Sequence, residues 1–139
     1  MRPLAKRKGE MEHQIKILIV EDEAILAMSI KRVLANLGYH VFRPVSTGEE
    51  AVQKAKQEKP DLVILDVLLG GKMDGFEVAN YLRSRYDISI IFMSGFQEEE
   101  LSHKIKTMGS PILLVKPFDP DDLKLAIDQT LKKHKAHNK

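Results

Sequence analysis

The chain has 139 residues, of which 43% are hydrophobic and 30% charged, a composition typical of a folded globular protein. No apolar run approaches the roughly 20 residues that a membrane-spanning helix requires, and residues 1–14 lack the apolar stretch of a signal peptide. The absence of cysteine excludes disulfides and thiolate metal sites and is typical of a cytosolic protein. We therefore expect a cytoplasmic location and no membrane partner.

The net charge of +2 is unevenly distributed along the chain. Residues 1–12 hold four basic and two acidic side chains, and residues 132–139 hold four basic and no acidic ones. Residues 13–131 keep the other 14 of the 22 basic side chains and 18 of the 20 acidic ones, so the body of the protein is mildly acidic. Because a nucleic-acid-binding protein needs a basic face on its folded body, we expect no direct contact with nucleic acid.

Strand and helix patterns alternate after the N-terminal residues. An apolar strand at 16–21 leads into a helix at 23–37, which stops before Gly38. The face of this helix that is expected to turn inward carries Leu26, Ile30, Val33 and Leu37. Residues 39–45 predict a second strand, and Pro44 within it indicates a position at the edge of the sheet.

The same alternation continues to the end of the chain. Ser46 and Glu49 fit a capping box that opens a helix ending near Glu58. The later elements are expected as strands at 62–66, 88–94 and 111–115 and helices at 75–85, 97–108 and 120–133. The apolar faces of these helices are expected to carry Phe76, Ala79 and Leu82, then Leu101, Ile105 and Met108, then Leu123, Ile127 and Leu131.

Five β-α units of this kind predict one doubly wound α/β domain built on a parallel sheet. We expect the domain to occupy residues 15–133. A flexible N-terminal tail at 1–14 and a basic C-terminal tail at 134–139 would flank it.

Four of the predicted strands end in polar side chains. The apolar runs at 17–20, 62–65, 90–93 and 112–115 lead into Glu21 with Asp22, Asp66, Ser94 and Lys116. The carboxyl ends of parallel strands meet at one edge of a sheet, and ligands bind at that edge. The sequence therefore predicts a site that combines three carboxylates, a hydroxyl and an amine.

The residue types in this set favour one kind of chemistry. Carboxylates at Glu21, Asp22 and Asp66 would repel one another unless a cation compensates them. Oxygen ligands without histidine or cysteine favour a hard cation, and Mg²⁺ fits best because it combines carboxylates with water and phosphate oxygens. With Ser94 as a donor and Lys116 as a positive charge, the set predicts a phosphoryl-transfer site with Asp66 as the nucleophile.

Five stretches carry a resemblance to a known family: KILIVEDEAILA at 16–27, PDLVILDVLL at 60–69, MDGFEVANYLR at 73–83, IIFMSG at 90–95 and LLVKPFDPDDL at 113–123. In this order they closely resemble the receiver domain of two-component response regulators, as in single-domain chemotaxis regulators, over about residues 15–133. The resemblance implies a flavodoxin-like fold, with five helices around a five-stranded parallel sheet in the order 2-1-3-4-5.

The resemblance also implies a role for each acid. Asp66 would accept a phosphoryl group from a phosphohistidine on a sensor histidine kinase or a phosphotransfer protein. Mg²⁺ would bind Asp22, Asp66 and the backbone carbonyl of Leu68 directly, and Glu21 mostly through a water molecule.

The other strand ends would respond to phosphorylation. Ser94 would bond one phosphoryl oxygen and report its presence, and Lys116 would pair with another. The peptide bond before Pro117 would be cis. The resulting switch would alter the binding of a downstream protein target, and the chain itself is expected to be a monomer or a weak dimer.

Three positions depart from the usual family pattern. Leu113 stands three residues before Lys116, where the family carries an aromatic switch residue, so the familiar ring rotation is unavailable. The loop LLGGKMDG after Asp66 lacks the frequent Met-Pro and is one residue longer than the commonest version, and it borders the expected metal. Glu21 stands where many relatives have Asp.

Three alternatives stay open. One is an interaction module of the receiver fold that signals without phosphorylation, which Leu113 motivates. Another is a receiver excised from a hybrid kinase or a larger regulator, because nothing after the fifth helix is long enough for an output domain. The last is a phosphatase, but such enzymes carry a second Asp two residues after the nucleophile, where this chain has Leu68. We therefore expect no enzyme beyond phosphorylation and dephosphorylation of its own Asp66.

Overall fold

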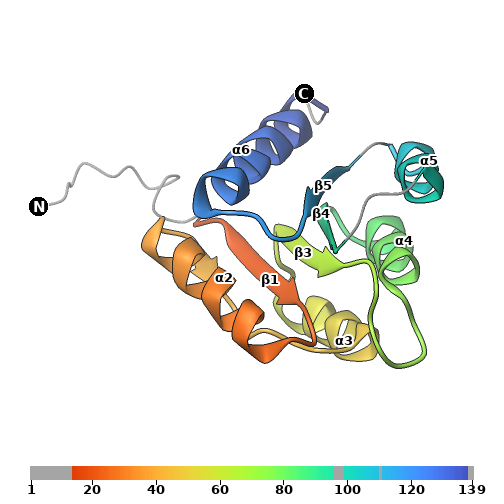
Figure 1. The fold of residues 1–139 in the computed structure, drawn as a ribbon, viewed down its shortest axis with the longest axis horizontal. Helices are drawn as coiled ribbons and strands as arrows, with labels where there is room; N and C mark the ends of the chain where they lie inside the picture. The colour runs from red at the N-terminus through yellow and green to blue at the C-terminus, as the bar shows by residue number, and fades with distance from the viewer. Residues whose placement is uncertain (1–13, 96–98, 110, 138–139) are drawn as a thin grey trace, which may run out of the picture.

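Five parallel strands form the sheet at the centre of the described chain (Figure 1). The computed structural model describes residues 14–95, 99–109 and 111–137. The strands are β1 (Lys16–Val20), β2 (His40–Val41), β3 (Leu62–Asp66), β4 (Ser89–Ser94) and β5 (Ile112–Val115). They lie in the order β2-β1-β3-β4-β5 with every neighbouring pair parallel, which confirms the expected flavodoxin-like sheet.

Helices cover both faces of this sheet (Figure 1). The described residues form α2 (Ala24–Asn36), α3 (Gly48–Glu58), α4 (Gly75–Arg85), α5 (Glu99–Thr107) and α6 (Pro120–His137). Helices α2 and α6 pack on one face, and α3, α4 and α5 pack on the other. None of these helices combines the length and the apolarity that a membrane crossing demands.

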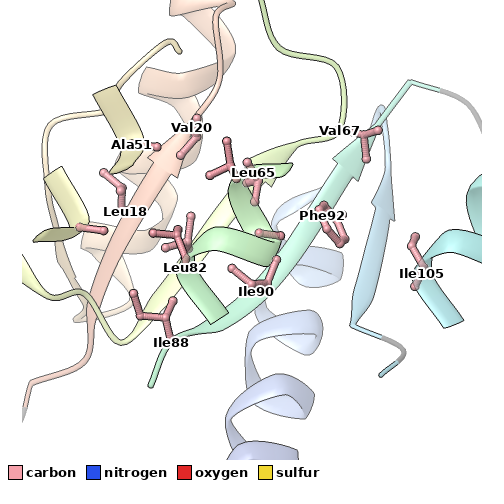
Figure 2. Packing of buried hydrophobic residues seen from close by; sticks show 14 of the residues in the cluster. Leu18, Val20, Ala51, Leu65, Val67, Leu82, Ile88, Ile90, Phe92 and Ile105 are labelled. Atoms are coloured by element: carbon pink, nitrogen blue, oxygen red, sulfur yellow. The ribbon is translucent and has the colours of Figure 1, made fainter. Parts of the chain in front are cut away.

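Alternate strand residues supply the two cores. Leu18 and Leu65 pack with the α3–α5 layer, whereas Ile19 and Ile64 pack with α2 and α6, as the two-residue period of a strand requires. Figure 2 shows the α3–α5 core, where Phe92 of β4 lies among side chains from several elements. Since β1, β3 and β4 are buried on both faces, their interior residues are all apolar, and polar residues occur only at the strand ends.

The strand register sets the height of each polar strand end. Val20 pairs with Leu65 and Asp66 pairs with Met93, so Glu21 follows β1 at the level of Asp66. Ser94 pairs with Val115, which places Ser94 one residue beyond that level and Lys116 two residues beyond it. At about 3.3 Å per residue this offset is about 6.6 Å, a length that the long lysine stem can span.

Helix α2 turns most of its expected face inward, because Leu26, Ile30 and Val33 all pack against the core on this side of the sheet. Its buried residues are Ala27, Ile30 and Leu34, and Leu37 is 40% exposed at the C-terminal cap. Ile30 was predicted correctly, but the sequence pattern favoured large side chains and passed over Ala27. The small Ala27 lets the helix approach the sheet closely, so Ala27 and Leu34 extend the expected inward face of the helix.

The second strand is shorter than the expected range 39–45. Regular pairing is limited to His40–Val41, and Val45 rejoins β1 through an isolated bridge to Val20. Pro44 has no N–H to donate, so continuous pairing cannot pass through it. The expected position of this strand at the edge of the sheet is confirmed.

Two helix ends also differ from the expected ones. The capping box of α3 is formed by Thr47 and Glu50, one residue later than Ser46 and Glu49. Helix α6 continues to His137 instead of ending at residue 133. The expected ranges 62–66 and 75–85 match β3 and α4. The described part of α5 begins at Glu99, and the expected start at residue 97 and the N-terminal residues 1–13 lie outside the described residues.

Candidate functional site

Three carboxylates meet at the carboxyl edge of the sheet. Glu21, Asp22 and Asp66 each offer an oxygen, and these oxygens lie within 4.8 Å of one another. Glu21 is 2% exposed and Asp66 is 6% exposed, whereas Asp22 is exposed to solvent. The structure thus brings together the three acids that the strand ends predicted, two of them buried.

Both carboxylate oxygens of Asp66 have hydrogen-bond partners. Oδ1 accepts the backbone N–H of Leu68 at 2.9 Å, and Oδ2 accepts Nζ of Lys116 at 2.7 Å. The bond from the residue two places later is the Asx-type turn that aspartate forms readily. The side chain of Leu68 is 60% exposed, so Leu68 acts on Asp66 through its main chain.

Glu21 is the most deeply buried acid of the site. Its Oε2 accepts the backbone N–H of Glu23 at 3.0 Å. Its Oε1 forms an ion pair with Nζ of Lys116 at a distance of 2.8 Å. The angle of this contact does not suit a hydrogen bond, so the buried Oε1 has no aligned hydrogen-bond donor. Burial raises the pKa of the Glu21 carboxyl, partly offset by Lys116 and the Glu23 N–H, and the nearby Asp66 charge raises it further.

Lys116 joins β5 to the two buried acids. Its ammonium is within 2.8 Å of Glu21 and 2.7 Å of Asp66, and it lies 4.0 Å from the exposed Glu23. Burial by itself would lower the pKa of Lys116, but its bonds to Asp66 and Glu21 outweigh burial and raise that pKa. The amine is therefore held charged among the acids.

Ser94 ends β4 beside this cluster. Its side chain is almost fully buried, and its backbone carbonyl accepts the N–H of Lys116 at 2.7 Å. The following Lys116–Pro117 peptide bond is cis, as the family resemblance implied.

Gly75 is a supporting residue that the sequence analysis did not single out. A Cβ on Gly75 would lie 2.3 Å from the carbonyl oxygen of Asp66 and 2.7 Å from the Cα of Val67. These are backbone atoms, so they cannot swing away as a flexible side chain would. The Gly75 N–H donates to the carbonyl of Val67 at 2.9 Å, and Asp74 caps the helix that starts here. Only glycine lets the start of α4 fit this closely under Asp66.

Leu113, the unusual residue of β5, is partly buried. It pairs with Phe92 of β4 and packs against the α3–α5 core. Because alternate residues of β5 face opposite sides of the sheet, Leu113 lies on the side opposite to its neighbours Ile112 and Leu114.

Comparisons with known proteins agree with this geometry. Residues 17–128 match the family model of the response regulator receiver domain. The transcriptional regulatory protein PdtaR of Mycobacterium tuberculosis is 35% identical over 113 residues, which make up 81% of this chain and 55% of that protein. The alkaline phosphatase synthesis transcriptional regulatory protein PhoP of Bacillus subtilis is 36% identical over 119 residues, or 85% and 49% of the two chains. The chain thus spans about half the length of these curated relatives.

Solved structures give the same result. The signal receiver domain of a modulated diguanylate cyclase from Desulfovibrio desulfuricans is 33% identical with a TM-score of 0.82, covering 90% of this chain and 99% of that one. A CheY-like receiver domain protein from Methanospirillum hungatei is 27% identical with a TM-score of 0.79, covering 90% and 99%.

Proposed function

The chain belongs to the response regulator receiver domain family, and we propose that it is a phosphoacceptor whose Asp66 takes a phosphoryl group from a phosphohistidine of a partner protein. The observation that carries this proposal is the setting of Asp66. Its carboxylate is buried at a strand end, and Lys116 and the Leu68 N–H hold its oxygens at 2.7 and 2.9 Å. Two further acids lie beside it.

In the proposed transfer, an oxygen of Asp66 attacks the phosphorus atom. The bond between that oxygen and phosphorus forms as the phosphorus–nitrogen bond breaks, and the donor imidazole leaves with the electron pair and takes up a proton. Lys116, which is paired with Asp66 before transfer, would then pair with a phosphoryl oxygen, and Ser94 would donate to another.

The donor set at this edge fits Mg²⁺. Three carboxylates without histidine or cysteine are ligands for a hard cation. The buried Glu21 Oε1, which lacks an aligned hydrogen bond, fits contact through water. Asp22, Asp66 and the carbonyl of Leu68 would hold the ion directly, and the ion would supply positive charge to the phosphoryl oxygens.

A partner that delivers the phosphoryl group must cover the opening beside Asp66. Large apolar residues are exposed close to the site in sequence: Ile25 is 89% exposed and Met28 52% on α2, which follows Asp22, and Leu68 lies two residues after Asp66. Single exposed apolar residues are ordinary, but three that follow the acids so closely in sequence favour a docking surface. We assign this surface to the cytoplasmic histidine kinase or phosphotransfer protein that acts as donor.

The direct test is phosphorylation by a small donor. With Mg²⁺ and acetyl phosphate the intact protein should gain one phosphoryl mass, and Asp66→Asn should gain none. Asp22→Asn is the informative companion, because it leaves the nucleophile in place and should slow labelling by weakening the cation. Failure of the wild-type chain to label, or equal labelling of Asp66→Asn, would contradict the proposal.

A second candidate is an interaction module that keeps the fold and signals without phosphorylation. The observation that favours it is Leu113, because an aliphatic side chain cannot perform the ring rotation that the family uses. The two functions can be distinguished by comparing the binding of the phosphorylated and unphosphorylated proteins to one target. Equal binding would favour the second candidate.

A further inference from the structure

A second cleft lies at the amino edge of the sheet, at the opposite end of the strands from Asp66. Its volume is about 280 Å³. It is lined by Ile88, which precedes β4, and by Ser89 and Ile90 at the start of that strand. The residue that precedes β5, the end of α4 and the last turns of α6 complete the lining. The phosphoacceptor chemistry uses none of these residues.

Cationic side chains from two helices converge on this cleft. Arg83 of α4 donates to the carbonyl of Met108, and Lys133 of α6 donates to the carbonyl of Gly109 at 3.3 Å. These carbonyls orient the two cations without carrying a full negative charge. His134 also lines the cleft, with its Nε2 3.3 Å from Oδ1 of Asp87. Among the described residues that line the cleft, none is acidic.

Hydroxyl groups lie in the same cleft. Thr130 lines it and is 8% exposed, and its Oγ1 is buried without a hydrogen-bond partner. Ser89 is buried to the same extent. A helical threonine usually bonds the carbonyl four residues earlier, so an unpartnered buried hydroxyl is a cost. A bound acceptor would remove this cost once the side chain rotates to bring Oγ1 to the surface of the cleft.

We propose that this cleft binds a small phosphorylated ligand. A phosphate group offers several oxygens at once and can accept from the Arg83 fork of α4 and from the Lys133 ammonium and the Thr130 hydroxyl of α6. The apolar side chains of Ile88 and Ile90 would contact the organic part. The volume lies just below the approximately 300–1,000 Å³ of common ligand pockets, which suits a small phosphate ester better than a nucleotide.

The test is a titration followed by backbone amide NMR on the full chain. Inorganic phosphate and glycerol 3-phosphate are the probes, and succinate at equal ionic strength is the carboxylate comparison. EDTA is present throughout, so that the acidic site holds no cation and repels anions. Saturable shifts at Ser89, Thr130 and Lys133, tighter for glycerol 3-phosphate than for succinate, are expected.

Matched variants distinguish specific binding in the cleft from nonspecific attraction of anions to positive charge. Lys133→Gln should weaken glycerol 3-phosphate binding by about tenfold, the usual loss for one charge-assisted hydrogen bond. Lys132→Gln removes the same charge from the exposed neighbouring residue, which does not line the cleft, and should leave binding unchanged. Thr130→Val should also weaken binding and should raise the denaturant midpoint of the free protein, because it removes the unpartnered hydroxyl.

The proposal is overturned if millimolar probe gives no saturable shift, if succinate binds as well, or if both lysine variants lose affinity equally. Normal binding by Thr130→Val would also overturn it, because it would show that the hydroxyl takes no part in the site, and the remaining donors are too few for a phosphate. Phosphorylation of Asp66 plays no part in these measurements, so their failure would not bear on the proposed phosphoacceptor function.

Discussion

The two edges of one sheet hold their charged groups in different ways. At the carboxyl edge, Lys116 lies within 2.8 Å of two buried acids, and opposite charges satisfy one another. At the amino edge, Arg83 and Lys133 bond backbone carbonyls. The contrast shows that a parallel sheet can support two unlike charge environments, because all of its strands begin at one edge and end at the other. At the carboxyl edge, removing one charged side chain would leave an opposite charge buried without its partner. At the amino edge, the proposed ligand would accept from Arg83 and Lys133.

The largest effect is expected from Lys116→Met. It leaves Glu21 and Asp66 buried without their cation, and we expect a loss of about 3 kcal/mol in the free energy of unfolding, at the lower end for a broken buried pair. The lower end applies because burial raises the pKa of Glu21, which can then take up a proton. Urea denaturation in EDTA measures the loss, and adding Mg²⁺ should reduce it.

The matched control is Lys124→Met on α6. Lys124 pairs with Asp128 at 3.0 Å, and both side chains are about half exposed. Exposed ion pairs contribute little to stability, because water and salt screen them, so this variant should be nearly as stable as the wild type. Equal losses for the two variants would remove the distinction between the carboxyl edge and an ordinary surface.

Gly75→Ala should destabilise the carboxyl edge without removing any charge. The new Cβ would meet backbone atoms at 2.3 and 2.7 Å, and overpacking of this kind costs about 1–3 kcal/mol. Because the strained atom is the carbonyl of Asp66, labelling by acetyl phosphate should also slow. Gly70→Ala in the same loop has no atom within 4 Å of its new Cβ and should change neither stability nor labelling.

Ile25→Asp tests the proposed docking surface beside the acids. We expect phosphotransfer from a phosphohistidine protein that labels the wild type to fall by about tenfold, as for a single important interface residue. Labelling by acetyl phosphate should not change, because this small donor needs no docking surface. Leu37→Ala, at the far end of the same helix and 40% exposed, is the control, and an equal effect there would contradict the assignment.

The smallest effect is expected at the cap of α3. Thr47→Ala removes the side chain that accepts the Glu50 N–H at 3.1 Å and should cost about 1 kcal/mol. Chemical denaturation measures this cost. The control is Gln57→Ala, at an exposed position of the same helix outside the capping box, and it should leave the stability almost unchanged. An equal loss for the two variants would contradict the role of Thr47 as the cap.

The sequence predicted best those elements whose ends are marked by local chemistry. The ranges of β3 and α4 came out correctly because Pro60 precedes the strand and Asp74 caps the helix. The inward face of α2 was only partly predicted, because the fit of Ala27 depends on how closely the helix approaches the sheet. The short β2 required knowing how Pro44 would interrupt pairing with a neighbour distant in sequence.

The candidate site shows the same limit. The strand-end pattern predicted that Glu21, Asp22 and Asp66 would gather, and the structure brings them together. The closeness of Gly75 to the carbonyl of Asp66 could not be read from the chain, because it depends on the path of the loop between them. Likewise, Leu68 was expected to offer its carbonyl to a metal, and the structure adds a hydrogen bond from its N–H to Asp66. The metal-binding and phosphoryl-binding roles of these residues stay predictions.

The register of β5 fixes the number of residues that the chain can have between Ile112 and Lys116. Lys116 reaches the acids because its backbone lies two residues beyond the level of Asp66, on the face that leads to them. Deleting one residue between Ile112 and Lys116 would shift the ammonium by about 3.3 Å and turn it to the opposite face of the sheet. Insertions and deletions should therefore be tolerated in the loop at 69–73 far better than in this strand.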